Sequence, residues 1–544
     1  MLRTIHPYPN FIIIIILQFS VCIAVHAAEL FTFIPSESAG DLGLVTRISV
    51  PESARYGSEG APILIHGGGG FQGDCLRERE TGLTEQGFIE IRFNFPGSGT
   101  GSDSSGGLFD NRGLHGLMAY RDIIRFAGGD HVDSDGNTLS DLTSPVVPLG
   151  TNIGLVGWSN GGNTNICVAG RYGNEIANLA WIVNWESPVG DGMPQAEAGS
   201  KDTVLRPFNP NINAAFDTLT GEWDLGSLKF GSQIQNPVLF DTQIHVTGGL
   251  YFDFNEDNEV DPGSDFIAYP LVFDINGSYK SYYSVRLRRE AAQRNLFPDP
   301  PPDHIPSLAE TEAFWAIRNG ALWVDSVLTY FPDLMFMIVA NEIDHVQRSP
   351  AHPPVVIQYN AFKNAQTRMV RLNPDKIYIN SIVGYEHPGA VDNAAQMDIT
   401  YANVRDYVEP GEATEPFGYS TIAAAGACEL ADRTQYNILD AQLNTLISGI
   451  PAQNKSTPEF RLFQNYPNPF NHQTMIRFVT DRTAHVVLTV TNIKGRRIET
   501  LLNQTLQSGS HEITWEGKDF ASGMYFLNLR VNGNRQIKKL LYLQ

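Results

Sequence analysis

The feature that most constrains the fold is residues 157–161, which read Gly-Trp-Ser-Asn-Gly. A short apolar run at residues 153–156 precedes them, and a segment that can open a helix follows. Glycines two residues to either side of Ser159 suit a tight, strained turn between a strand and a helix, where side chains would collide. The amides at the start of that helix would face Ser159, and the amide of Asn160 is placed to hold a negatively charged oxygen. The segment therefore predicts an exposed, reactive serine at the end of a buried strand.

Apolar runs elsewhere predict a sheet into which this turn fits. Residues 31–50 alternate loosely and predict one or two edge strands. Buried strands are predicted at residues 62–66, 88–95, 153–156, 179–185, 334–340 and 367–372, and helices at residues 114–126 and 355–365. Such alternation favours a mainly parallel sheet with helices on both faces.

A second glycine-rich segment follows the strand at residues 62–66. His66 is followed there by four glycines, residues 67–70. Glycines let bare backbone amides approach a substrate carbonyl closely. We therefore predict an oxyanion hole formed by the amides of Asn160, Gly67 and Gly68.

A serine hydroxyl becomes a good nucleophile when an imidazole takes its proton and a carboxylate orients that imidazole. Asp344 follows the strand at residues 334–340, and His387 lies beyond the last strand, so both are expected at the carboxyl edge of the sheet. We predict a triad of Ser159, Asp344 and His387. The alternatives are His352 or His345 as the base and Glu186 or Glu342 as the acid.

Together these motifs make residues 60–400 resemble an α/β-hydrolase of the dienelactone-hydrolase or prolyl-oligopeptidase-like kind. The resemblance implies a doubly wound, mainly parallel sheet and a covalent acyl-enzyme. Hydrolysis of a carboxylic ester is the favoured activity. A serine peptidase is the first alternative, and a non-catalytic α/β-hydrolase-like binding protein is the second.

Residues 191–309 interrupt the strand–helix pattern and are too long for one connecting loop. We predict an inserted, partly β cap over the serine. Within it, oxygen-bearing side chains alternate and resemble the calcium loops of extracellular proteins. The predicted calcium ligands are Asp253, Asn255, Asp257, the carbonyl of Glu259, Asp261 and Asp265. No cofactor is expected for catalysis.

The two ends of the chain predict export. Residues 1–27 combine Arg3, an apolar core and small residues before a cleavage point after Ala27, which is typical of a signal peptide. No later run is long and apolar enough to be a transmembrane segment. Three cysteines then remain: Cys167 is expected to be buried, and Cys75 and Cys428 are a possible disulfide pair.

The composition changes after residue 457. Residues 458–544 carry 11 basic and 6 acidic residues, whereas the whole chain has a net charge of −21. That overall charge argues against a nucleic-acid partner. Short strands separated by turns predict a β-sandwich, and residues 464–471, 492–496, 509–515 and 521–526 resemble a type IX secretion (Por) sorting domain. The resemblance implies export by the type IX secretion machinery; a carbohydrate-binding or adhesive module is the alternative.

The predicted organisation has six parts. They are a signal peptide (1–27), the first part of the hydrolase core (28–190), the cap (191–309), the second part of the core (310–450), a linker (451–459) and the sorting domain (460–544). The sequence thus predicts a secreted or cell-surface serine hydrolase.

Overall fold

The computed structural model describes most of the chain from residue 28 onward. It covers residues 28–543 except 71, 78–80, 177, 193–196, 200–211, 240, 262, 276, 342–352, 376, 380–398, 402–403, 405–418, 439–459, 463–464, 466–469, 481, 493–495, 518–519 and 533. The predicted signal peptide and linker therefore lie outside the described residues.

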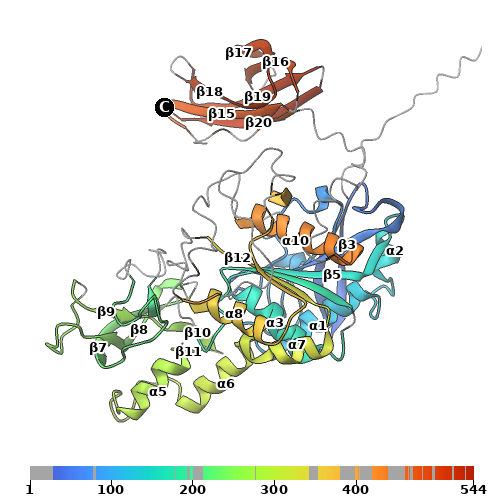
Figure 1. Cartoon of the computed structure of the whole chain (residues 1–544). Helices are drawn as coiled ribbons and strands as arrows, with labels where there is room; N and C mark the ends of the chain where they lie inside the picture. Colours follow the sequence, from blue (N-terminus) through green and yellow to red (C-terminus); the bar gives the residue numbers. More distant parts are fainter. Residues whose placement is uncertain are drawn as a thin grey trace, which may run out of the picture.

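One eight-stranded sheet forms the centre of the molecule (Figure 1). Its strands are β1 (Ala28–Ser36), β2 (Gly40–Val50), β3 (Ala61–Gly68), β4 (Ile89–Phe93), β5 (Pro148–Trp158), β6 (Leu179–Trp185), β12 (Met335–Val339) and β13 (Met369–Leu372). Their order is β1-β2-β4-β3-β5-β6-β12-β13. β2 runs antiparallel to both neighbours, and every pair from β4 to β13 is parallel. This order is that of the α/β-hydrolase fold, as predicted.

Helices cover both faces of this sheet (Figure 1). One core cluster joins the sheet to α1 (Leu114–Gly128), α3 (Asn160–Tyr172), α7 (Val324–Tyr330) and α8 (Pro353–Asn364), and another joins it to α10 (Tyr419–Tyr436). Successive residues of β5 divide between the two, with Leu155 in the first and Val156 in the second. This alternation is what a strand buried on both faces requires.

Short elements complete this part of the chain. They are α2 (Leu139–Thr143) and the 3-10 turns Glu37–Ala39, Gly57–Glu59, Thr84–Gln86, Gly101–Asp103 and Gly320–Trp323.

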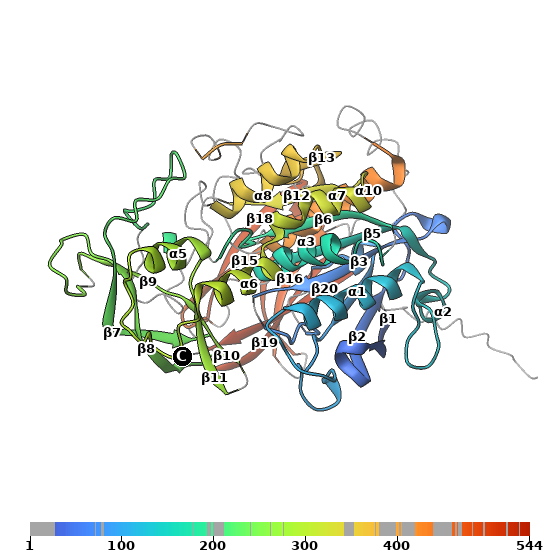
Figure 2. The same cartoon turned by 90° about the horizontal axis from the view of Figure 1, so that it is seen from below.

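A separate group of elements lies between β6 and β12. It comprises the sheet of β7 (Leu228–Val238), β8 (Asp241–Phe252) and β9 (Phe266–Ala268), the hairpin of β10 (Leu271–Ile275) and β11 (Ser278–Tyr282), and the helices α5 (Val285–Gln293) and α6 (Leu308–Arg318). Figures 1 and 2 show these elements gathered at one side of the central sheet. They enclose hydrophobic clusters of their own. A partly β insertion after the sixth strand is thus present, while its exact limits stay a prediction.

The C-terminal region is entirely β. One sheet holds β14 (Phe460–Leu462), β15 (Gln473–Thr480) and β18 (Gly509–Glu516), and the other holds β17 (Arg497–Leu506), β16 (Ala484–Asn492), β19 (Gly523–Val531) and β20 (Asn534–Tyr542). All pairings within them are antiparallel. A single cluster between the sheets joins Trp515 and Ile476 to Leu488 and Leu527. The predicted β-sandwich is confirmed.

The disulfide between Cys75 and Cys428 that the sequence left possible is not formed in the structure. Cys75, Cys167 and Cys428 are all buried, and no disulfide joins any two of them in the described structure. Cys75 belongs to the core on the α1 face of the sheet and Cys428 to the core on the α10 face, so the sheet separates them. None of the helices in the described part of the chain has the length and apolarity of a membrane span.

Candidate active site

Ser159 stands between the end of β5 and the start of α3, as predicted. Its φ is 49° and its ψ is −134°, a backbone conformation that residues with a side chain rarely adopt. The backbone amide of Ser159 donates to the carbonyl of Trp185 on β6 at 2.9 Å, and the residue is half-buried. The strained turn therefore leaves the serine partly open to solvent at the carboxyl end of β5.

The glycines around Ser159 are required by close backbone packing. A methyl group at Gly157 would lie 2.6 Å from the carbonyl carbon of Gly161. A methyl group at Gly161 would collide with the carbonyl oxygen of Gly68. The turn that carries Ser159 is thus interlocked with the glycine-rich segment after β3.

That segment, residues 66–70, is called the glycine loop below. A side chain at Gly67 would collide with Asn165 of α3, and one at Gly69 would collide with the indole ring of Trp158. The predicted oxyanion residues Asn160, Gly67 and Gly68 therefore lie together beside Ser159.

A buried contact between a histidine and a carboxylate lies where the glycine loop begins. Nε2 of His66 lies 2.8 Å from Oε2 of Glu90, and both side chains are almost fully buried. Arg92 lies 3.3 Å from the same carboxylate, which also accepts hydrogen bonds from Thr81 and Thr84. Burial acts to raise the pKa of Glu90, yet His66, Arg92 and Thr84 outweigh it and hold that pKa far below its usual range. The first residue of the glycine loop is therefore anchored to β4.

Two tryptophans flank the serine turn. The rings of Trp158 and Trp185 stack with centroids 5.5 Å apart and planes 25° apart. The register of β5 and β6 pairs these two residues directly. Sequence analysis assigned them no role, because their contact depends on the pairing of the two strands.

Of the candidates for the acid and the base, the structure describes Glu186. Asp344 and His387 lie outside the described residues, as do the alternatives Glu342, His345 and His352. The other alternative acid, Glu186, follows β6, is 6% exposed and has a φ of 51°. It comes directly after the residue that accepts the hydrogen bond from the amide of Ser159.

Arg112 contacts the glycine loop, and sequence analysis did not single it out. Its guanidinium is buried, with 1% of the residue exposed, and it donates to backbone carbonyls of the glycine loop. Arg112 precedes α1 and is 45 residues from Gly67 in the chain. No local pattern distinguishes it from a surface arginine, so no signal in the sequence alone could have found it.

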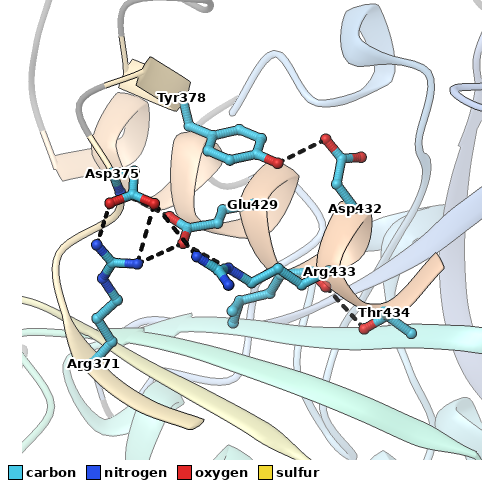
Figure 3. A network of polar contacts seen from close by, with 8 residues as sticks. Arg371, Asp375, Tyr378, Glu429, Asp432, Arg433 and Thr434 are labelled. Carbon is cyan, nitrogen blue, oxygen red and sulfur yellow. Dashed lines mark hydrogen bonds and ion pairs between the residues drawn. The ribbon is translucent and has the colours of Figure 1, made fainter. Parts of the chain in front are cut away.

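A second cluster of buried charges lies near the end of β13 (Figure 3). Arg371 donates to Glu429 at 3.0 Å, and Arg433 donates to the same carboxylate at 2.9 Å. Asp375 pairs with both guanidiniums, while its amide donates to Glu429 at 2.7 Å. Two guanidiniums thus face two carboxylates, and together they tie α10 to the chain that leaves β13.

The same helix is held to the beginning of the core. Nε and Nη2 of Arg55 donate to the two oxygens of Asp432 at 2.6 and 2.7 Å. Tyr56 and Tyr378 donate to this carboxylate at 2.9 and 3.1 Å. The segment that follows β13 is therefore held against α10 immediately before residues 380–398, which contain the predicted base.

The predicted calcium loop uses its carboxylates to hold its own backbone. Asp265 accepts the amides of Phe254 and Asp261 at 3.1 and 2.9 Å, and Asp253 accepts the amide of Asn258 at 3.1 Å. The ammonium of Lys229 lies 2.7 Å from Asp253. Among the described residues, no group of three or more His, Cys, Asp or Glu side chains is gathered as a metal site.

One carboxylate oxygen in that loop does not take part in these contacts. Oδ1 of Asp253 has no hydrogen-bond partner in the described structure, although the residue is fully buried. A buried carboxylate oxygen of this kind, in a loop rich in oxygen ligands, suits a hard cation. Calcium at Asp253, Asn255, Asp257, Glu259, Asp261 and Asp265 remains a prediction.

Comparison with known proteins identifies the C-terminal region. Residues 464–542 match the family model described as the secretion system C-terminal sorting domain. This match confirms the predicted sorting domain and indicates a secreted or cell-surface protein that uses the corresponding secretion machinery. A search of curated protein sequences found no significant match.

Solved structures give more distant likenesses. Dimeric latent PorU from Porphyromonas gingivalis is similar over 15% of this chain and 9% of its own, with 21% identity and a TM-score of 0.14. Brefeldin A esterase, a bacterial homologue of human hormone-sensitive lipase, is similar over 75% and 78% of the two chains, with 11% identity and a TM-score of 0.35. A puromycin hydrolase is similar over 64% of this chain and 34% of its own, with 12% identity and a TM-score of 0.31.

Proposed function

We propose that this protein is a secreted serine hydrolase that cleaves carboxylic esters through an acyl-enzyme. The observation that carries the proposal is the strained backbone of Ser159, held at the end of β5 against the glycine loop. Strain of this kind persists where the surrounding structure imposes it, and it is common at active sites. A sheet in the α/β-hydrolase order places this turn at the edge where active sites of open α/β sheets lie.

Each residue has a chemical role in the proposed reaction. Ser159 attacks the ester carbonyl, and His387 takes its proton and later returns one to the leaving alcohol. Asp344 orients the imidazole. The amides of Asn160, Gly67 and Gly68 stabilise the negative charge that develops on the carbonyl oxygen.

The test compares the wild type with Ser159→Ala on short-chain p-nitrophenyl esters and on peptide p-nitroanilides. Ester hydrolysis that falls by at least about 10⁴-fold in the variant supports the proposal, because the variant lacks the nucleophile. Anilide hydrolysis with the same dependence on Ser159 would instead make the protein a peptidase. Failure of a fluorophosphonate to label Ser159 in the wild type would leave the non-catalytic binding protein as the better description.

A second comparison assigns the acid. Asp344→Asn and Glu186→Gln each remove one candidate carboxylate at nearly constant volume. We expect Asp344→Asn to lower kcat by about 10⁴-fold, because a triad without its carboxylate holds the imidazole in the wrong tautomer. We expect Glu186→Gln to change kcat less than tenfold; the reverse pattern would assign the acid to Glu186.

A further inference from the structure

We propose that Arg112 positions the glycine loop so that its amides serve the oxyanion hole. The inference rests on the proposed function, because it assigns a residue to that reaction. It concerns a positioning residue: Arg112 acts through the backbone of the loop, whereas the amides contact the substrate.

The contacts of Arg112 converge on one short stretch of backbone. Nη1 donates to the carbonyl of Gly67, and Nη2 donates to the carbonyl of Gly69 at 2.9 Å. Nη2 and Nε also donate to the carbonyl of Gln72 at 3.0 and 3.2 Å. One guanidinium therefore fixes three carbonyls of a segment that is rich in glycine and otherwise free to rotate.

Fixing these carbonyls also fixes the amides that follow them. In a planar trans peptide the carbonyl of one residue and the N–H of the next point in opposite directions. Because the carbonyl of Gly67 faces Arg112, the N–H of Gly68 points away from Arg112. Gly68 is one of the predicted oxyanion donors, and its own carbonyl lies against Gly161 of the serine turn.

The charge of Arg112 is not balanced by a carboxylate in the described structure. Its hydrogen-bond acceptors are carbonyls and the sulfur of Cys75, which lies 3.2 Å from Nη2. Below the guanidinium, the ring of Phe95 lies 4.5 Å from its central carbon. A buried cation with neutral partners is costly in an apolar interior. A developing oxyanion beside the glycine loop would supply the missing negative charge.

The backbone around Arg112 is itself held in place. Arg112 and Asn111 have φ values of 59° and 55°, so the chain turns sharply before α1. The carboxylate of Asp110 accepts the amides of Gly113 and His115 at 2.8 and 2.7 Å, which ties it to the start of α1. Arg318 of α6 donates to the carbonyls of Asp110 and Asn111 at 2.7 and 3.1 Å. The guanidinium is thus presented to the glycine loop from a rigid support.

The experiment uses the full chain with Arg112→Met and Arg112→Lys. Arg47→Met is the matched control, because Arg47 is also buried but lies on β2, where it pairs with Glu29 at 3.4 Å. For each protein, kcat and KM on the p-nitrophenyl ester are measured. Hydrogen exchange of the amides of residues 67–70 is measured in parallel and needs no activity.

We expect Arg112→Met to speed exchange in the glycine loop and to lower kcat about 10–100-fold while KM changes less than threefold. Arg112→Lys keeps the charge without the planar fork and should give an intermediate kcat. Arg47→Met should leave both readouts near the wild type.

Three results would separate failure of this inference from failure of the proposed function. Unchanged exchange in the glycine loop of Arg112→Met, with kcat near that of the wild type, would overturn the positioning role. Faster exchange in that variant together with an inactive wild type would uphold the positioning and overturn the esterase assignment. A loss of kcat with unchanged exchange in Arg112→Met would also overturn the positioning role, since Arg112 would then act without moving the loop.

Discussion

Two sets of buried arginine contacts in the α/β core differ in how the positive charge is balanced. Near β13, Arg371 and Arg433 face the carboxylates of Glu429 and Asp375. At the glycine loop, Arg112 is surrounded by carbonyls, a sulfur and an aromatic ring. The balanced cluster joins α10 to the sheet, whereas the unbalanced one meets the candidate oxyanion hole.

The difference suggests a division of roles. Guanidiniums paired with carboxylates satisfy each other and keep two elements together, so their loss should appear mainly in stability. A cation held by neutral groups keeps its charge available to a bound anion, so its loss should appear mainly in catalysis.

The first prediction concerns the balanced cluster. Arg433→Met leaves Glu429 and Asp375 facing one guanidinium in place of two, inside the protein. Breaking a buried pair in this way should lower the free energy of unfolding by about 3–5 kcal/mol, as measured by urea denaturation. The kcat of the folded variant, measured at low temperature, should stay within a factor of about three.

The pair of half-buried Arg477 and exposed Glu512, 3.9 Å apart, is open to solvent and provides the control. Arg477→Met should cost less than about 1 kcal/mol, because exposed ion pairs contribute little. A large fall in kcat with normal stability in Arg433→Met would contradict the proposed division of roles.

Sequence analysis predicted the sheet well because its strands are short apolar runs bounded by polar or turn residues. The strand predicted at residues 179–185 coincides with β6. It did not assign α10, since the run of alanines at residues 423–425 lies in a helix with no clear polar face. Periodicity distinguishes a helix only where apolar and polar faces alternate.

Prediction of the site was uneven for a different reason. Ser159 and the glycine loop carry local motifs, and the structure brings them together. Arg112 and the pair of Trp158 and Trp185 owe their positions to contacts between distant parts of the chain. Asp344 and His387 were predicted from chain order alone, and their assignment stays a prediction.

The second prediction uses the buried carboxylate of Glu90, which lies against His66 at the start of the glycine loop. Because Glu90 has a folded-state pKa below its ordinary value of 4.5, the folded protein binds fewer protons at this site than the unfolded chain. Its contribution to stability should therefore be complete above about pH 5 and decline as the pH falls. Between about pH 7 and pH 3, the free energy of unfolding should fall less in Glu90→Gln than in the wild type.

At pH 7, Glu90→Gln should itself be less stable by about 2 kcal/mol, since it weakens hydrogen bonds of a buried carboxylate. Glu85→Gln, on the adjacent 3-10 turn, serves as the comparison for the same chemical change. Equal pH dependence in the wild type and Glu90→Gln would show that the buried carboxylate of Glu90 does not contribute to the pH dependence of stability in this range.

The last prediction concerns the reverse imbalance, carboxylates that outnumber their cations, at residues 253–265. Here Lys229 is the cation paired with Asp253, whose second oxygen has no partner in the described structure. We expect calcium to raise Tm by about 2–4 °C relative to EDTA, because a cation bound to the folded state stabilises it. Asp253→Asn should remove this difference, whereas Asp241→Asn, at the start of β8, should keep it. If the wild type melts at the same temperature in calcium and in EDTA, Lys229 suffices to balance the loop and the calcium prediction is wrong.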